Sequence, residues 1–303
     1  MLSVIICTYN RDRYVYNVLK SIADGSLPTV EYEIVLVNNN SSDNTAHECT
    51  RFHQDFPSVN FMYVFEERQG LSYARNRGIQ ESRGNVLVYV DDDALVNKDY
   101  LVTYNHFFAK HPMVYAAGGP ILPQYDDCVE PNWMSHYTRQ LVTGRLYLGE
   151  SERVFHRGSY PGGGNAAYRK EVFDKIGFFN VELGRKGESL IGAEEKDLFD
   201  KMNSLGIKFY YLPTAILYHL IPSRKLTNEY FDKLTYSIGV SEKYRTLNKS
   251  RGKYFVRLLH ESIKWFVTIV LWTFFMLKLQ PSKGKKLILF RYNVTKGLIL
   301  GSL

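Results

Sequence analysis

Cysteine is scarce in this sequence: its 303 residues contain only three, Cys7, Cys49 and Cys128. An odd count without metal-like spacing excludes a disulfide framework and indicates reduced thiols in a cytosolic setting. Cys7 lies in an apolar run, where we expect a small core residue. The N-terminus also lacks a basic leader followed by a long apolar segment. We therefore expect no signal peptide and a chain that begins directly in its fold.

Internal repeats and low-complexity tracts are also absent, and the length suits one large domain or a domain with an appendage. Acidic residues are nearly missing from residues 243–303, where thirteen lysines and arginines accompany one acid, Glu261. Residues 1–242 hold the other 25 basic and 30 acidic residues, so a body of charge −5 precedes a tail of charge +12. Such basic tails bind anionic membrane surfaces or nucleic acid.

The tail lacks a long uncharged apolar run. Its longest, 265–277, has 13 residues, whereas a spanning helix needs about 20. This run lies within a wider stretch, 258–279, whose Lys264 and Lys278 can snorkel. A weaker apolar stretch follows at 287–300. We interpret the two as interfacial helices on an anionic membrane surface at the cytoplasmic face. A spanning segment and a helix packed on the protein's own core are the alternatives, and the apolar content disfavours a nucleic-acid partner.

The first part of the chain alternates short apolar runs with helical patterns, which predicts a mixed, mostly parallel α/β sheet flanked by helices. The expected strands are 3–7, 33–37, 61–65, 86–90 and 114–117, and the expected helices are 14–23, 45–56, 71–82 and 98–110. Residues 118–164 are irregular. After them we expect strands at 165–168, 208–212 and 215–218, and helices near 170–176 and 193–204.

Three consecutive carboxylates, Asp91–Asp93, follow the apolar run 86–90. Like charges this close repel each other, and a cation relieves the repulsion. Mg²⁺ or Mn²⁺ carrying a diphosphate would do so, whereas a solvated acidic turn is the simpler alternative. Polar residues at 8–10 and 38–40 also follow expected strands. Because ligands of parallel sheets bind at the carboxyl ends of the strands, we predict a site there.

Six motifs, in their order and spacing, resemble those of the family 2 glycosyltransferases, which have the GT-A fold. They are Ser3–Arg11, Val37–Asp43, Gly70–Gly78, Asp91–Asp93, Gly162–Ala167 and Gly192–Asp197. The resemblance covers roughly residues 1–220. It implies a GT-A domain at 1–222, with a nucleotide-binding half at 1–118 and an acceptor-side half at 119–222, followed by a helical tail at 223–303.

The resemblance also implies an activity. Family members of this kind are inverting, metal-dependent hexosyltransferases that move a sugar from a nucleotide-diphosphate sugar to a hydroxyl. For this chain the expected acceptor is a glycan or a lipid-linked glycan in surface polysaccharide synthesis. The alternatives are a catalytically inactive, membrane-binding relative and a sugar-phosphate nucleotidyltransferase. A nucleotidyltransferase would have a loop rich in glycine and arginine after the first strand, but this chain has Cys7–Arg11 there.

Several residues match positions that contact the donor in the family. They are Thr8, Asn10, Arg11, Asn38, Arg75, Asp91, Asp92, Gly163, Gly164 and Asn165. Asn38 replaces the usual aspartate that contacts the base. Asn offers one acceptor and one donor group, but a UDP-sugar remains our default expectation. The simpler alternatives are a helix cap for Thr8, a solvated helix face for Arg75 and a plain turn for the glycines.

The metal, Mg²⁺ or Mn²⁺, is expected to act as a Lewis acid on the departing diphosphate. By resemblance Asp93 is its first ligand, Asp91 is a further candidate ligand that lies nearer the ribose, and Asp92 could share either role. His219 ends the apolar run 216–218, where a histidine either ligates the metal or lies in the core.

Glu194 and Glu195 replace the family's usual Glu-Asp pair and open an amphipathic helix. Acidic residues in a first helical turn are favoured by the helix dipole alone. The resemblance implies that Glu195 takes the proton of the acceptor hydroxyl, with Glu194 as the alternative base.

Overall fold

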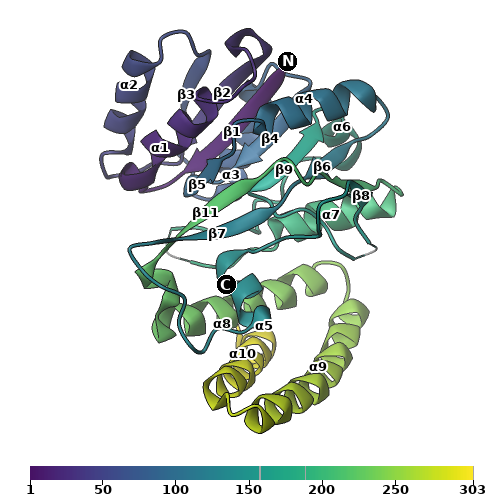
Figure 1. Cartoon of the computed structure of the whole chain (residues 1–303). Helices are drawn as coiled ribbons and strands as arrows, with labels where there is room; N and C mark the ends of the chain where they lie inside the picture. Colours follow the sequence, from purple (N-terminus) through teal and green to yellow (C-terminus); the bar gives the residue numbers. More distant parts are fainter. Residues whose placement is uncertain (157, 188, 303) are drawn as a thin grey trace. The chain divides into compact units, whose positions relative to one another are not determined.

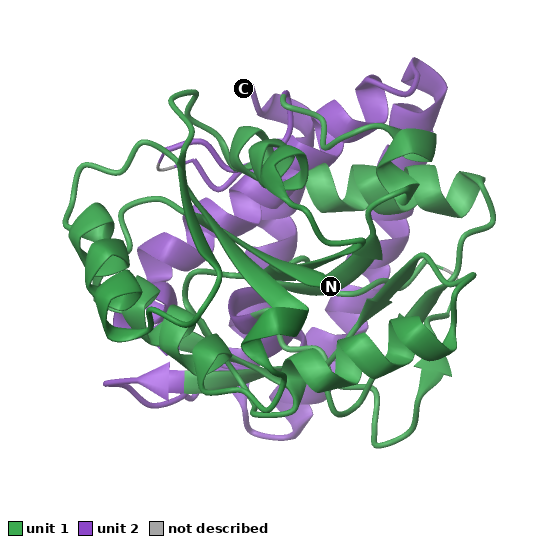
Figure 2. Ribbon diagram, turned by 90° about the horizontal axis from the view of Figure 1, so that it is seen from above, with its two compact units in different colours: residues 1–124, 144–181, 194–220 green, residues 125–143, 182–193, 221–303 purple. Residues whose placement is uncertain are grey.

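The computed structural model describes residues 1–156, 158–187 and 189–302. They divide into two compact units, coloured separately in Figure 2. The first comprises residues 1–124, 144–181 and 194–220, and the second comprises 125–143, 182–193 and 221–303. The boundary predicted near residue 222 lies next to Ile221, where the last segment of the second unit begins. Residues 125–143 and 182–193, assigned from the sequence to the acceptor-side half, belong instead with the C-terminal helices.

The first unit is built on an eight-stranded sheet in the order β3-β2-β1-β4-β9-β6-β10-β8. The strands are β1 (Leu2–Thr8), β2 (Tyr32–Asn38), β3 (Phe61–Phe65), β4 (Val86–Val90), β6 (Ala116–Gly118), β8 (Arg153–Val154), β9 (Asn165–Arg169) and β10 (Phe209–Tyr211). β1 is parallel to β2 and β4, β2 to β3, and β6 to β10. Only β9 and β8 run antiparallel to their neighbours in this sheet. This is the mixed, mostly parallel sheet that the sequence predicted.

A second sheet has the order β5-β11-β7. Its strands are β5 (Ala94–Val96), β11 (Leu217–Pro222) and β7 (Ile121–Asp126). The antiparallel pairing of β11 with β5 sets His219 opposite Ala94, directly after the three aspartates. The sequence analysis predicted neither β5 nor β7, because a three-residue strand and a strand containing proline give weak periodic signals.

Helices of the first unit cover the sheet. They are α1 (Asp12–Ala23), α2 (Thr45–Asp55), α3 (Leu71–Glu81), α4 (Tyr100–Lys110), α6 (Val172–Ile176) and α7 (Glu194–Ser204), with a 3₁₀ turn at Thr29–Glu31. In α1 the buried positions recur every three or four residues, which produces one apolar face. α1 and β1 to β4 are labelled in Figure 1.

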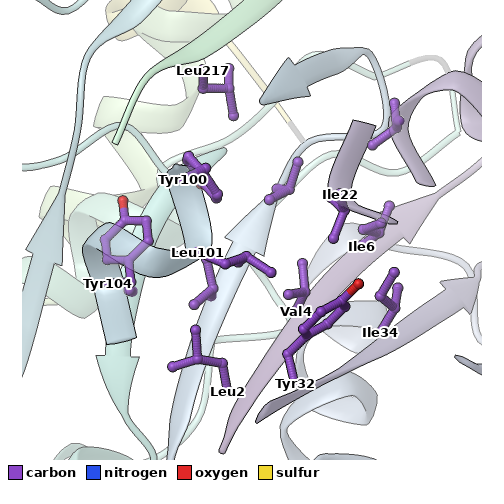
Figure 3. Close-up of a cluster of buried hydrophobic side chains, with 14 of the residues drawn as sticks. Leu2, Val4, Ile6, Ile22, Tyr32, Ile34, Tyr100, Leu101, Tyr104 and Leu217 are labelled. Atoms are coloured by element: carbon purple, nitrogen blue, oxygen red, sulfur yellow. The ribbon is translucent and has the colours of Figure 1, made fainter. Parts of the chain in front are cut away.

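The core of the first unit follows the two-residue period of its strands. Leu2, Val4 and Ile6 of β1 enter one buried cluster, whereas Ile5 enters the cluster on the other face. Figure 3 shows the first cluster, in which β1 side chains lie near Ile22 of α1. With both faces buried, β1 and β4 are fixed firmly enough to position the polar residues that follow them.

The second unit is helical. Its helices are α5 (His136–Thr143), α8 (Asn228–Leu247), α9 (Arg251–Leu277) and α10 (Pro281–Leu300), with a 3₁₀ turn at Ser223–Leu226. The Thr227 and Ser250 hydroxyls accept backbone hydrogen bonds at the starts of α8 and α9. α9 is long and apolar enough to cross a membrane by length and composition alone.

Glycines allow α8 and α10 to approach closely. A Cβ atom added to Gly239 of α8 would collide with the Val294 carbonyl, and one added to Gly297 of α10 would collide with the Tyr236 carbonyl. Backbone atoms cannot move aside as a side-chain end can. The two helices therefore need these glycines at their contact.

We expect Gly239→Ala or Gly297→Ala to destabilise the second unit by about 1–3 kcal/mol, the usual range for overpacking. All three tryptophans lie in this unit, so the urea midpoint followed by tryptophan fluorescence reports on it. The control is Gly252→Ala in α9, where the added Cβ would lie 3.8 Å from the Ser250 hydroxyl oxygen. A control variant less stable than the other two would contradict the close contact.

Candidate active site

Two elements of the first unit bring charged or protonatable side chains to the aspartates at the end of β4. The loop after β1 supplies Arg11, whose Nε lies 3.4 Å from Asp92 Oδ1 and whose Nη2 lies 3.8 Å from Asp93 Oδ2. β11 supplies His219, whose Nε2 lies 3.3 Å from Asp93 Oδ1. The aspartates thus face cationic or protonatable groups on two sides, at the edge of the sheet where the sequence predicted a site.

The aspartates are strongly perturbed. Burial raises the pKa of Asp91, and the charge of Asp93 raises it further. Burial also raises the pKa of Asp92 to about 6, although the Arg11 guanidinium opposes this. Removing carboxylates from water and placing them together disfavours their charged forms. A bound cation would reverse that effect.

The arrangement provides a pair of metal-binding side chains. Within the described ranges, no group of three or more His, Cys, Asp or Glu side chains is placed to hold one ion. Asp93 and His219 are adjacent, whereas Asp91 lies against the backbone of Gly164. An oxygen and an imidazole nitrogen fit a divalent cation if the ligand's own oxygens complete its shell.

A second charged cluster lies at the start of α7. Arg75 of α3 donates from Nη1 to Glu194 Oε1 at 2.9 Å and from Nη2 to Glu195 Oε1 at 2.6 Å. The side chains of Arg75 and Glu194 are 4% and 6% exposed, whereas that of Glu195 is 30% exposed. Glu195 is therefore the carboxylate that an external molecule can reach.

Arg75 remains charged in this setting. Burial alone would lower the pKa of its guanidinium, but the carboxylates of Glu195 and Glu194 raise it well above its usual value. The guanidinium also lies over the rings of Phe179 and Tyr89, at 5.2 and 5.8 Å. The sequence analysis expected Arg75 on the nucleotide side, whereas the structure joins it to the two glutamates.

Two glycines give the carboxylates room. The N–H of Gly163 donates to Glu195 Oε2 at 3.1 Å, and a Cβ at this position would collide with the Glu195 carboxylate. A Cβ on Gly164 would collide with the Asp91 carboxylate. From the sequence we expected Gly163 and Gly164 to approach the donor closely, whereas in the structure they approach the side chains of Glu195 and Asp91.

Asn165 differs from its expectation. Its Oδ1 accepts from the hydroxyls of Tyr100 and Tyr104 at 2.8 and 2.7 Å, and its Nδ2 donates to the carbonyls of Pro120 and Ala215 at 2.8 and 2.9 Å. The residue is fully buried and all its amide hydrogen-bonding capacity is used. Its visible role is to hold β9 to α4 and the neighbouring loops, not to donate to a sugar.

The loops after β1 and β2 hold each other. Asn10, with a φ of 53°, accepts from the Ser42 N–H at 2.8 Å. Asn38 Oδ1 accepts from the Ser41 N–H at 2.9 Å, and its Nδ2 donates to the Tyr63 hydroxyl at 2.8 Å. Asn38 is buried and engaged on both sides of its amide. Thr8, at the end of β1, is also buried.

The comparisons with known proteins agree with this fold. A model of the family described as "Glycosyl transferase family 2" matches residues 3–177, more than half of the chain. The chain belongs to this family of glycosyltransferases.

Among its relatives, the "Glucosyl-dolichyl phosphate glucuronosyltransferase" of Haloferax volcanii is 27% identical over 205 residues. That match covers 64% of this chain and 60% of the relative. The "Glycosyltransferase GlyA" of Streptococcus pneumoniae is 26% identical over 257 residues, covering 84% of this chain and 30% of the relative. The chain thus spans less than two thirds of either relative.

Solved structures share the GT-A fold. The mannosyltransferase PcManGT from Pyrobaculum calidifontis, in complex with GDP-Man and Mn²⁺, has a TM-score of 0.60 at 16% identity, covering 98% of this chain and 87% of that chain. Residues 1–349 of TarS from S. aureus, in complex with UDP-GlcNAc, have a TM-score of 0.50 at 18% identity, covering 97% and 90%. At these identities the likeness concerns the fold.

We expect Gly163→Ala to lower turnover about 100-fold, because the methyl group would displace the Glu195 carboxylate by about an ångström or more. Hydrolysis of a nucleotide-sugar measures this effect, and circular dichroism checks the fold. The matched control is Gly162→Ala, whose Cβ would meet only the flexible end of the Ile121 side chain. Equal activity in the two variants would contradict the role assigned to Gly163.

Proposed function

We propose that this glycosyltransferase is inverting and metal-dependent, and that it moves a sugar from a nucleoside-diphosphate sugar to an acceptor hydroxyl. The observation that carries the proposal is the presence of two distinct charged centres in the first unit. One pairs Asp93 with His219, which suits a metal diphosphate. The other holds a partly exposed carboxylate, Glu195, against a fixed positive charge.

The first centre would bind the diphosphate. Asp93 and His219 would hold Mg²⁺ or Mn²⁺, which would act as a Lewis acid on the departing phosphate oxygens. Arg11, beside Asp92 and Asp93, supplies a permanent positive charge for the same phosphates. Asp91 lies deeper, against Gly164, and we assign it to the ribose side of the donor.

The second centre would supply the base. As the acceptor oxygen bonds to the anomeric carbon, the bond from that carbon to the diphosphate breaks and the acceptor proton passes to Glu195. The Gly163 N–H and Arg75 fix both oxygens of this carboxylate. One base that activates one acceptor in a single displacement inverts the anomeric configuration. Glu194, more deeply buried, would orient Arg75.

The donor base is proposed to be uracil. The two structural neighbours named above carry GDP-Man and UDP-GlcNAc, so this fold accommodates either base in those proteins. Asn38 would contact the base only by exchanging one of its internal hydrogen bonds. We therefore propose that it shapes the pocket through Ser41 and Tyr63 and that a UDP-sugar is the donor.

The proposed acceptor is a glycan or lipid-linked glycan in surface polysaccharide synthesis. The name of the Haloferax relative, which includes a dolichyl phosphate sugar, supports a lipid-linked acceptor. The apolar helix α9 and the basic residues around it support peripheral attachment to the cytoplasmic face of a membrane through residues 243–303.

The first test is turnover of a panel of nucleotide-sugars with Mg²⁺, with Mn²⁺ and after treatment with EDTA. We expect metal-dependent turnover of one donor. Asp93→Ala should abolish the metal dependence together with most activity, and Glu195→Gln should lower transfer by about 10²–10⁴-fold, the range for loss of general base catalysis. Full activity of Glu195→Gln would move the base to Glu194, and turnover unaffected by EDTA would refute the metal.

A second test separates the charge of Arg75 from its geometry. Arg75→Lys keeps the charge but not the two-pronged contact, so we expect kcat to fall about 10–100-fold with an unchanged KM for the donor. Arg75→Met removes both the charge and the hydrogen bonds that hold the base, so we expect a larger fall in kcat than for Arg75→Lys.

The control for Arg75 is Arg77→Met on the same helix, where the arginine pairs with Glu81 near the surface. Thermal unfolding of each variant shows whether it retains its fold. An Arg75→Met variant with the kcat of the native chain would contradict the assignment of Arg75 to the base.

A further inference from the structure

Helix α9 has an inverted polarity. Its buried side chains are Arg257, Glu261 and Thr268. Eleven of its large apolar side chains are instead between 37 and 79% exposed: Phe255, Val256, Leu259, Ile263, Phe266, Val267, Ile269, Val270, Trp272, Phe274 and Leu277. We call these eleven residues the outer face of α9. A surface helix of a soluble protein has the opposite arrangement.

The buried polar side is committed to contacts within the second unit. Glu261 accepts from Arg257 Nη1 at 2.6 Å and from Arg291 Nη1 of α10 at 2.8 Å. Arg257 Nε also lies 3.3 Å from Glu242 Oε2 of α8. Trp265 Nε1 donates to Thr295 Oγ1 of α10 at 2.9 Å. Rotating α9 to hide its outer face would break all these contacts, so the outer face needs a cover of its own.

The charges around the outer face suit an anionic lipid surface. Exposed cations lie at both ends of the outer face. Lys249, Arg251 and Lys253 precede it in the chain, and Lys278 and Lys285 follow it. The one acid in residues 243–303, Glu261, is buried between two arginines. An apolar face bordered by cations and free of exposed acids is the pattern of a helix that binds anionic bilayers.

The buried ion pairs determine which orientation of α9 in a bilayer is favourable. From Phe255 to Leu277 the helix is about 33 Å long at 1.5 Å per residue, enough to span the hydrocarbon core. A spanning orientation would carry Arg257, Glu261 and Arg291 into that core, where charged groups are costly. An orientation parallel to the surface immerses only the outer face and leaves the ion pairs on the side of α8 and α10.

We propose that α9 lies in the plane of an anionic membrane, with its outer face among the acyl chains and its polar face directed to α8 and α10. This orientation rests on the proposed function, for which it specifies how the chain binds its membrane partner. Membrane binding can be measured without enzymatic turnover.

The test is flotation of the full chain with vesicles of phosphatidylcholine containing phosphatidylglycerol, and with phosphatidylcholine alone. We expect binding to the anionic vesicles and at least about tenfold weaker binding to the neutral ones. Phe266→Asp with Val270→Asp should lower binding by at least about tenfold, because it charges the centre of the outer face. The matched control is Val30→Asp with Met113→Asp, two exposed apolar residues of the first unit.

Three results would overturn the inference. The first is equal binding by the two double variants, or no binding by the native chain. The second is resistance to extraction with alkaline carbonate, which would indicate a spanning helix. The third is a dimer in light scattering that Phe266→Asp with Val270→Asp abolishes without lipid, which would assign the outer face to a second copy. Hydrolysis of a soluble donor by the same variant, unchanged in each case, keeps these results separate from a failure of the proposed transferase activity.

Discussion

The positive charge of Arg75 is the constraint on which the rest of the site depends. A buried guanidinium is costly unless it is paired and hydrogen-bonded, and here two carboxylates from a helix more than 100 residues away provide the partners. The pair joins α3 to α7. It also gives the two adjacent acids at the start of α7 a shared positive partner.

The same charge affects the donor side. The pKa of Asp91 is raised by burial and by Asp93, and it is lowered by Arg75. Glu195 and Asp91 lie against consecutive glycines, so the two charged centres approach each other across the backbone of Gly163 and Gly164. A site that must hold a polyanionic donor next to an anionic base has this difficulty in general. In the proposed reaction, buried Arg75 would compensate the charge of the base by pairing with Glu195, and a metal diphosphate on Asp93 would add charge compensation from the donor side.

Much of this could be predicted from the sequence because the signals were local. The strands 61–65 and 86–90 have the predicted bounds, since each is a compact apolar run. The aspartates after β4 were expected at a sheet edge for the same reason. By contrast, the pairing of Arg75 with Glu194 and Glu195 depends on tertiary structure, and the sequence around these residues does not indicate it. Asn165 shows the same limit: its partners Tyr100 and Tyr104 are four residues apart on one helix, but nothing in the chain links that helix to β9.

The C-terminal helices show why composition alone left their role open. The uncharged run 265–277 looks short for a membrane segment, yet α9 extends over 27 residues, and Arg257 and Glu261 in its first half are buried. Which side is buried depends on Arg291 and Glu242, contributed by other helices. A periodic sequence pattern indicates that a helix has a polar and an apolar face, but it does not indicate which face packs against the rest of the protein. In α9 the polar face finds its partners within the protein, and the apolar face is therefore available to lipid.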